Sequence, residues 1–235
     1  MNRKLTILTA VATIVLAVSS CELKMKKNLP PTSVEEYGKI TSFERIRIKA
    51  ACEIRYRQAD ETKVTTFVKG KYEPQSVTVK SDGEWLFIEQ EQKLLREWKK
   101  GKGKIVVEIS SPDLIEVDMR GAGTFQVDGN LDTDTLLIRM KGAGKITIPS
   151  LVCDRLQANL KGVGSFDFGK VTAQYAQLGI EGVGNIRAMF HNSGSVGCSL
   201  RGVGNITLSG NAEKLTKNRR GTGRIDTSEL KINGE

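Results

Sequence analysis

The sequence predicts an all-β protein: a parallel β-solenoid preceded by a β-rich N-terminal portion. Two observations carry this prediction. A Gly-x-Gly triplet occurs six times, and its first glycines are about 20 residues apart, at Gly121, Gly142, Gly162, Gly182, Gly202 and Gly221. Apolar and polar residues alternate on both sides of each triplet, which is the period of a β-strand. A repeat of this length is typical of coils that stack on one another.

Residues 1–20 have the pattern of an export signal. Arg3 and Lys4 precede an almost uninterrupted apolar run that is short for a membrane span. Small residues then lead to Cys21, as in the bacterial lipobox. We therefore expect Cys21 to be lipidated and to become the N-terminus of a membrane-anchored chain. The alternative is an ordinary cleaved signal followed by a chance cysteine.

Residues 21–40 are predicted to be a tether between the lipid anchor and the folded domain. They show no periodic apolar pattern, and Pro30-Pro31 stiffens them. Three lysines near the anchor suit contact with anionic head groups. Surface-exported lipoproteins of the Bacteroidota often carry an acidic run here, and this chain lacks it. The expected location is the cell envelope at the outer membrane, with the periplasmic face favoured over the cell surface.

Residues 41–110 are predicted to form short strands, because runs rich in β-branched and aromatic residues alternate with turn formers such as Ser81-Asp82-Gly83. The segment 91–104 interrupts this pattern with six basic residues, two acidic residues and Trp98. It has two interpretations: a basic flap with an aromatic anchor for a polyanion or a membrane, or a solvated hairpin tip.

Residues 111–230 form the predicted solenoid, in which each coil is a strand, a glycine corner and a second strand. A corner residue needs a positive φ or room for the neighbouring coil's backbone, and glycine permits both. The middle residues of the triplets are small or β-branched, and we expect them at a tight inward corner; they are Ala122, Ala143, Val163, Val183, Val203 and Thr222. Lys217 and Arg219 replace apolar residues in the last coil, which predicts a polar cap.

The order of these features resembles the head-GIN-domain family, which is labelled "putative auto-transporter adhesin" and is common among secreted or lipid-anchored proteins of the Bacteroidota. The resemblance covers about residues 40 to 228 and rests on the lipobox, the strand ending in ISSPDLIEVDMRGAG, the coils and the terminal RRGTGRID. It implies an all-β, right-handed β-helix. It supplies no catalytic residues.

The residue before each triplet gives the candidate binding site. These positions form a predicted column of five cations and one carboxylate: Arg120, Lys141, Lys161, Glu181, Arg201 and Arg220. We call the five cations the basic stripe. They suit an extended acidic glycan or a membrane surface. The alternative is a soluble edge that resists aggregation, with Glu181 relieving the repulsion between its neighbours.

Several function classes are disfavoured. His191 is the only histidine and is expected in an exposed loop, so a histidine-based catalytic or metal site is not expected. Outward-facing residues at equivalent positions of the coils form two columns, one that begins at Asp118 and one that begins at Gln126. Neither column places two carboxylates on adjacent coils, which glycosidic chemistry requires. The triplets do not open a helix, so they are not predicted to hold phosphate. No cofactor, metal or nucleic acid is expected.

Three cysteines follow Cys21, and their spacing does not choose a disulfide among Cys52, Cys153 and Cys198. Cys198 lies on an inward column and is expected to be buried. The function predicted from the sequence is a non-catalytic, adhesin-like envelope lipoprotein that presents a solenoid surface to an unidentified partner, such as an acidic glycan or another envelope protein. The alternatives are polyanion binding through the basic stripe and, less favoured, a polysaccharide-degrading β-helix enzyme.

Overall fold

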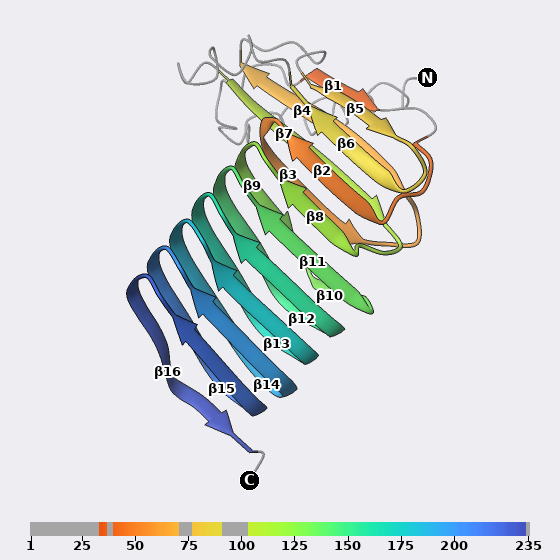
Figure 1. Ribbon diagram of the computed structural model, residues 1–235. Coiled ribbons are helices and arrows are strands. Elements are labelled where there is room, and N and C mark those ends of the chain that lie inside the picture. Colours follow the sequence, from red (N-terminus) through yellow and green to blue (C-terminus); the bar gives the residue numbers. More distant parts are fainter. Residues whose placement is uncertain (1–32, 37–39, 71–76, 91–102, 234–235) are drawn as a thin grey trace, which may run out of the picture. The chain divides into compact units, whose positions relative to one another are not determined.

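The computed structural model describes residues 33–36, 40–70, 77–90 and 103–233, and within these ranges the protein is all-β, as predicted (Figure 1). The first strands are β1 (Ser33–Glu36), β2 (Arg45–Lys49), β3 (Ala51–Gln58), β4 (Lys63–Gly70), β5 (Thr78–Ser81), β6 (Trp85–Glu89), β7 (Gly103–Ser111) and β8 (Glu116–Met119). The later strands are β9 (Ala122–Val127), β10 (Asn130–Asp132), β11 (Thr135–Met140), β12 (Ala143–Leu160), β13 (Val163–Ile180), β14 (Val183–Leu200), β15 (Val203–Arg219) and β16 (Thr222–Ile232). None of the described residues forms a helix long and apolar enough to span a bilayer.

Some predictions concern residues outside these ranges. The export signal, Cys21, most of the tether and most of the segment 91–104 are not described by the structure. Within the range predicted as the tether, residues 33–36 form β1, which pairs with β4.

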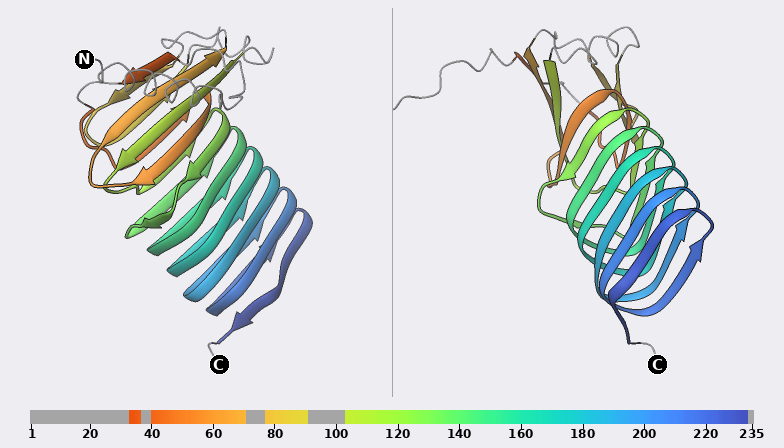
Figure 2. Two further views of the ribbon diagram at one scale, coloured as in Figure 1. Left: turned by 180° about the vertical axis from the view of Figure 1, so that it is seen from behind. Right: turned by 90° about the vertical axis from the view of Figure 1, so that its left-hand side faces the viewer.

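The glycine repeats form the predicted parallel β-solenoid. β12, β13, β14 and β15 each run around one coil, and adjacent coils pair in parallel with equivalent residues opposite each other (Figure 2). Ile146, for example, lies opposite Phe166, which lies opposite Ile186. Residues at equivalent positions of successive coils therefore form columns along the stack, with a spacing of about 4.8 Å between neighbours.

The apolar columns predicted beside the corners are buried. The column two residues before the first glycine is fully buried in five consecutive coils: Met119, Met140, Leu160, Ile180 and Leu200. The column four residues after it is at most 1% exposed: Phe125, Ile146, Phe166, Ile186 and Ile206. Period-2 alternation puts these side chains inside the coil and their neighbours outside. The core is thus a set of ladders that run along the stack.

The parallel stack continues beyond residue 111 toward the N-terminus. β2 pairs in parallel with β8, and β3 pairs in parallel with β9, so residues 45–58 make a further level of the solenoid. β6 and β7 stack in parallel on the far sides of β2 and β3. The predicted strands of the region 41–110 are therefore present, but their order in space is not their order in the chain.

Antiparallel strands complete this end of the sheet. β4 pairs antiparallel with β7, β1 with β4, and β5 with β6. A sheet edge exposes unpaired backbone groups that can recruit another chain. The change from parallel to antiparallel pairing ends the regular stack on which a further coil would be added.

The opposite end of the stack has the polar character predicted for a cap. Lys217 and Arg219 are exposed, and both reach across to β16. Lys217 Nζ donates a hydrogen bond to Thr227 Oγ1 at 3.1 Å, and Arg219 donates one to the Gly223 carbonyl at 2.9 Å. β16 pairs with β15 and with no other described strand. Charged side chains thus cover the end of the last coil.

Candidate functional site

The glycine corners position the candidate site, and both predicted reasons for glycine apply. A Cβ on Gly202 would lie 1.8 Å from the Gly182 carbonyl oxygen, so neighbouring backbone fills the space of a side chain. Gly204 has a φ of +145°, and a Cβ there would lie 1.7 Å from the Gly184 carbonyl oxygen. The first glycine of the triplet is required because the neighbouring backbone lies too close for a side chain. The second glycine is required for the same reason and because its φ is positive.

The middle residue of the triplet lies outside the coil, which corrects the predicted inward corner. Val163, Val183 and Val203 are 59%, 49% and 50% exposed. The inner side of the bend is already filled by buried side chains two residues before and four residues after the first glycine. The side chain of the middle residue must therefore lie on the outer side of the bend.

The residues before the triplets stack as expected along this outer edge. All six, including Glu181, are exposed. Backbone hydrogen bonds fix their register, as from Lys161 N to the Met140 carbonyl at 2.8 Å and from Arg201 N to the Ile180 carbonyl at 2.7 Å. The sequence period therefore brings the five cations of the basic stripe into one column, although their binding role stays a prediction.

Acidic neighbours neutralise part of the basic stripe. Arg120 contacts Asp118 at 2.8 Å, and Lys161 contacts Glu181 at 2.9 Å. The hydrogen bond from Lys161, followed by that from Asn159, lowers the pKa of Glu181. The other three cations form no ion pair with any described residue; they are Lys141, Arg201 and Arg220. The available positive charge of the stripe is concentrated on these three.

Asp118 is buried, although the sequence placed it in an outward column. Its side chain is 1% exposed and contacts Arg47 at 3.1 Å as well as Arg120. Burial acts to raise the pKa of Asp118, but the hydrogen bonds and charges of Arg120 and Arg47 outweigh it, and the pKa is lowered. The reason for the difference is β2, which covers β8 in the stack and supplies Arg47.

Sequence reasoning missed the ionic network on this face. Glu116, two residues before Asp118, forms ion pairs with Arg45 and Arg139. Arg47 also lies over the Trp85 ring, with its guanidinium carbon 4.1 Å from the ring centroid. The sequence does contain a signal for this network: basic residues alternate in 45–49, and acidic residues alternate in 116–119. The two segments are far apart in the chain, so the sequence alone did not show that they pair.

The described carboxylates of the two outward columns, Asp118, Asp167 and Asp226, each form an ion pair with a cation. Asp167 contacts Lys145 at 3.2 Å, and Asp226 contacts Arg224 at 3.6 Å. A general acid that works near neutral pH needs a raised pKa. Every described carboxyl group with a shifted pKa is shifted downward: Glu53, Asp118, Glu181 and Asp226. The described ranges contain no group of three or more potential metal ligands.

The three described cysteines are buried free thiols. Burial raises the pKa of Cys52 to about 12 and that of Cys198 to about 11. Burial, with smaller contributions from Asp154 and Asp132, raises the pKa of Cys153 to about 12. Thiols in this state are poor nucleophiles. The expected burial of Cys198 is confirmed, and His191 is exposed as expected.

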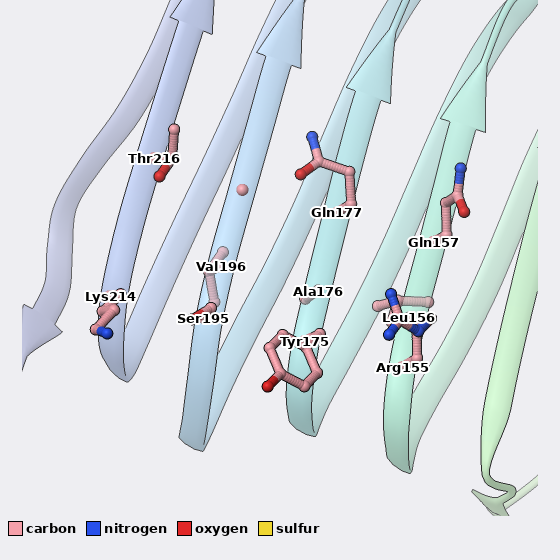
Figure 3. A pocket seen from close by; sticks show the side chains of 11 residues that line it. Arg155, Leu156, Gln157, Tyr175, Ala176, Gln177, Ser195, Val196, Lys214 and Thr216 are labelled. Atoms are coloured by element: carbon pink, nitrogen blue, oxygen red, sulfur yellow. The ribbon is translucent and has the colours of Figure 1, made fainter.

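A groove that sequence reasoning missed lies on the outer side of the strand segments that lead to the glycine corners (Figure 3). It has a volume of about 400 Å³ and crosses the second halves of β12, β13, β14 and β15. Its polar and aromatic lining comprises Arg155, Gln157, Tyr175, Gln177, Ser195, Lys214 and Thr216. These residues stand at equivalent positions of successive coils, where the chain varies from repeat to repeat.

Comparison with known proteins agrees with this architecture. The family described as "Putative auto-transporter adhesin, head GIN domain" matches residues 42–189. A crystal structure described as a "putative adhesin" from Bacteroides fragilis is 26% identical, with a TM-score of 0.67, and the match covers 83% of this chain and 96% of that one. A "putative adhesin" from Parabacteroides distasonis shares the fold at 14% identity, with a TM-score of 0.54 and coverage of 84% and 97%. No curated protein matches the sequence.

Proposed function

Because the chain belongs to the head-GIN-domain family of "putative auto-transporter adhesins", we propose that it is a non-catalytic, adhesin-like lipoprotein of the cell envelope. One observation carries this proposal. The outer faces of the solenoid consist of exposed side chains that repeat once per coil in register along the stack. Such a surface suits a long or repetitive partner, because successive coils offer equivalent contacts.

The absence of catalysis is part of the proposal. Its support is that Asp118, Asp167 and Glu181 are each held by a cation rather than by a second carboxyl group. The anchor in the proposal is a lipid on Cys21, which would hold the solenoid at the outer membrane, with the periplasmic face favoured over the cell surface. Its support is the lipobox pattern and the basic tether that follows.

A second candidate function is polyanion binding through the basic stripe. The observation that favours it is the exposure of Lys141, Arg201 and Arg220 without an ion pair among the described residues. These cations would contact successive anionic groups of an acidic glycan or of a membrane surface. Their attraction would weaken with added salt, because exposed charges are screened.

The main proposal is tested with the full-length chain, tagged at its C-terminus and purified from membranes in detergent. We expect saturable binding to isolated cell envelopes that excess untagged protein competes away. Heat-unfolded protein is the control, since an adhesive solenoid surface requires the folded stack. Equal binding by folded and unfolded protein would contradict the proposal, and so would release of reducing or unsaturated ends from acidic polysaccharides.

Lipidation is tested separately by incorporation of labelled fatty acid in growing cells. We expect the label in the full-length chain and none in the Cys21→Ser variant. A labelled Cys21→Ser chain would overturn the assignment of the anchor to Cys21. Protease treatment of whole cells then shows which membrane face carries the domain.

The second candidate is tested by reversing three charges together, in the variant Lys141→Glu, Arg201→Glu and Arg220→Glu. We expect a loss of binding to heparin and to anionic vesicles. A matched variant changes the same number of exposed cations outside the stripe: Lys170→Glu, Arg187→Glu and Lys231→Glu. Equal losses of binding in both variants would mean that the net charge of the protein, and not the basic stripe, causes the binding.

A further inference from the structure

The groove of Figure 3 has the features of a ligand site rather than of an ordinary solenoid face. Tyr175 is 53% exposed and is the only exposed aromatic side chain in the described part of the chain. An exposed tyrosine ring combines an apolar face with a polar tip. Such rings are common where a protein contacts a partner that is apolar on one side and polar on the other.

One face of the Tyr175 ring is left open by its neighbours in the stack. Arg155, one coil before, places its guanidinium carbon 5.4 Å from the ring centroid. Ser195, one coil after, is too small to cover the other side of the ring. Lys214 stands one coil further on, about 10 Å from Tyr175 at two strand spacings. The space above Ser195 is therefore walled by an aromatic ring and by an ammonium group.

The next column widens this space and adds hydrogen-bonding groups. Gln177 lies opposite Gly197, which lies opposite Thr216. Because Gly197 has no side chain, the Gln177 amide extends over it: a Cβ on Gly197 would lie 2.1 Å from Gln177 Oε1. Side-chain amides both donate and accept hydrogen bonds, as sugar hydroxyls require of a partner. The backbone N–H groups at this level already serve the parallel ladder, so side chains must supply the contacts.

The charge of the groove selects for an anion. Its lining holds two cations, Arg155 and Lys214, and no carboxylate. Neither cation forms an ion pair with a described residue. The adjoining groove of about 570 Å³ shares Tyr175, Ser195 and Lys214 with this one, and its lining also contains Asp132, Asp134, Asp154 and Glu213. An anionic ligand would therefore be held toward Arg155, which lines only the first of these two grooves.

We propose that this groove binds a carboxylated oligosaccharide. The C–H face of one sugar ring packs on the open face of Tyr175, above Ser195. The amides of Gln157 and Gln177 exchange hydrogen bonds with hydroxyl groups, and Arg155 or Lys214 contacts a carboxylate. The inference rests on the proposed function, because it identifies one class of partner for the adhesive surface and centres its contacts on Tyr175 rather than on the basic stripe.

The test uses the full-length chain and oligogalacturonides of two to four sugars, with binding measured by calorimetry. Uncharged dextran oligosaccharides of equal length serve as the ligand control. Tyr175→Ala should weaken binding of the charged sugar at least about tenfold, whereas Tyr175→Phe should retain most of it, since the ring remains. Ser195→Gln, which fills the space before the ring, should weaken binding to a similar extent.

The charge requirement is tested by Arg155→Gln and Lys214→Gln together, which should remove the preference for the charged sugar over dextran. All five substitutions lie on the outer face, and each variant's melting temperature shows whether the fold persists. Loss of binding in the triple stripe variant, with Tyr175→Ala unaffected, would overturn this site in favour of the basic stripe.

The remaining outcomes separate this inference from the proposed function. If oligogalacturonide does not bind but the chain still binds envelopes saturably, the saccharide site is wrong and the adhesive function stands. If neither ligand nor envelope binds, both proposals fail.

Discussion

The coils from β12 to β15 and the strands from β2 to β8 use the same parallel stacking in different ways. In the coils, each residue lies against the equivalent residue of the next repeat, as Ile146 lies against Phe166. In the N-terminal region, Ile46 lies between Leu86 and Val117, which are far apart in the chain. One region is stacked in the order of the sequence, and the other is interleaved. Only the first kind of stacking leaves a period in the sequence.

The two regions also differ in what completes a corner. In the glycine coils, the middle residue donates its N–H to the first glycine's carbonyl in the preceding coil, as Val203 does to Gly182 at 2.9 Å. At the level of β2 and β3, the corner is Ala50-Ala51-Cys52, and Ala51 N donates to Gln90 Oε1 at 3.1 Å. A buried side-chain amide thus replaces a backbone carbonyl. The corners of the coils are therefore closed by a repeated backbone hydrogen bond, whereas the corner at the N-terminal end is closed by one specific side chain.

The largest expected effect on stability comes from a substitution at a glycine corner of the coils. Gly204→Ala adds a Cβ where the Gly184 carbonyl oxygen is 1.7 Å away and demands a positive φ. We expect a loss of about 3 kcal/mol or more in the free energy of unfolding, measured in urea. Val203→Ala, on the exposed residue beside it, should cost less than about 0.5 kcal/mol. Equal costs would mean that the corner relaxes easily.

The second effect tests the ionic network of the N-terminal region. Asp118→Asn removes the charge shared by Arg47 and Arg120 and should cost about 2 kcal/mol at pH 7. Asp226→Asn in the last coil is the control, because its ion pair is exposed, and it should cost less than about 0.5 kcal/mol.

The pH dependence of the Asp118 effect follows from the lowered pKa of this carboxyl group. A carboxyl group with a lowered folded-state pKa stabilises the fold above its unfolded pKa of about 3.9. This contribution is lost as the pH falls through the lower folded-state pKa. The difference between wild type and Asp118→Asn should therefore shrink in acid, and a constant difference down to the acid transition would contradict the assignment.

A smaller effect is expected at the corner that lacks glycine. Gln90→Leu leaves the buried Ala51 N–H without its acceptor and should cost about 1 to 2 kcal/mol in chemical unfolding. Gln126→Leu replaces an exposed glutamine and should be close to neutral. A neutral Gln90→Leu would show that the Gln90 side chain does not close this corner.

The smallest expected effect is a difference in the labelling rate of two buried cysteines, which compares the two regions without any substitution. Cys52 lies in the N-terminal level and Cys198 in a late coil, and both are buried with raised pKa values. We expect slow labelling by a thiol reagent in the native state, with Cys198 labelled before Cys52, because a stack opens from its end. Labelling followed by peptide mass spectrometry gives the order. The reverse order would show that the interleaved region opens first.

Much of the solenoid could be predicted because its determinants are local and repeated. The alternation around Ile146, Phe166 and Ile186 identified the core columns, and the glycines identified the corners. The basic stripe was predictable as a column for the same reason. Its partial neutralisation was harder to foresee: Glu181 was visible in the sequence as a neighbour of Lys161, but the burial of Asp118 depends on Arg47 from β2.

The groove around Tyr175 could not be predicted from the repeat. Its residues occupy positions where the coils differ, and a position that differs from coil to coil carries no period. Tyr175, Ser195 and Lys214 become neighbours only when β13, β14 and β15 are stacked in register. An exposed aromatic residue beside a small one was the available signal, and it has meaning only with the register known.

The sequence by itself determined the all-β class, the coil length, the corners and the buried columns. These follow from backbone sterics and side-chain alternation, which act within one repeat and are copied to the next. Only the tertiary structure decided that β8 inserts beside β2, that Asp118 is buried between two arginines, and that Tyr175 faces an open groove. Those features depend on contacts between segments distant in the chain, and the free energy of such contacts is set by packing rather than by local pattern.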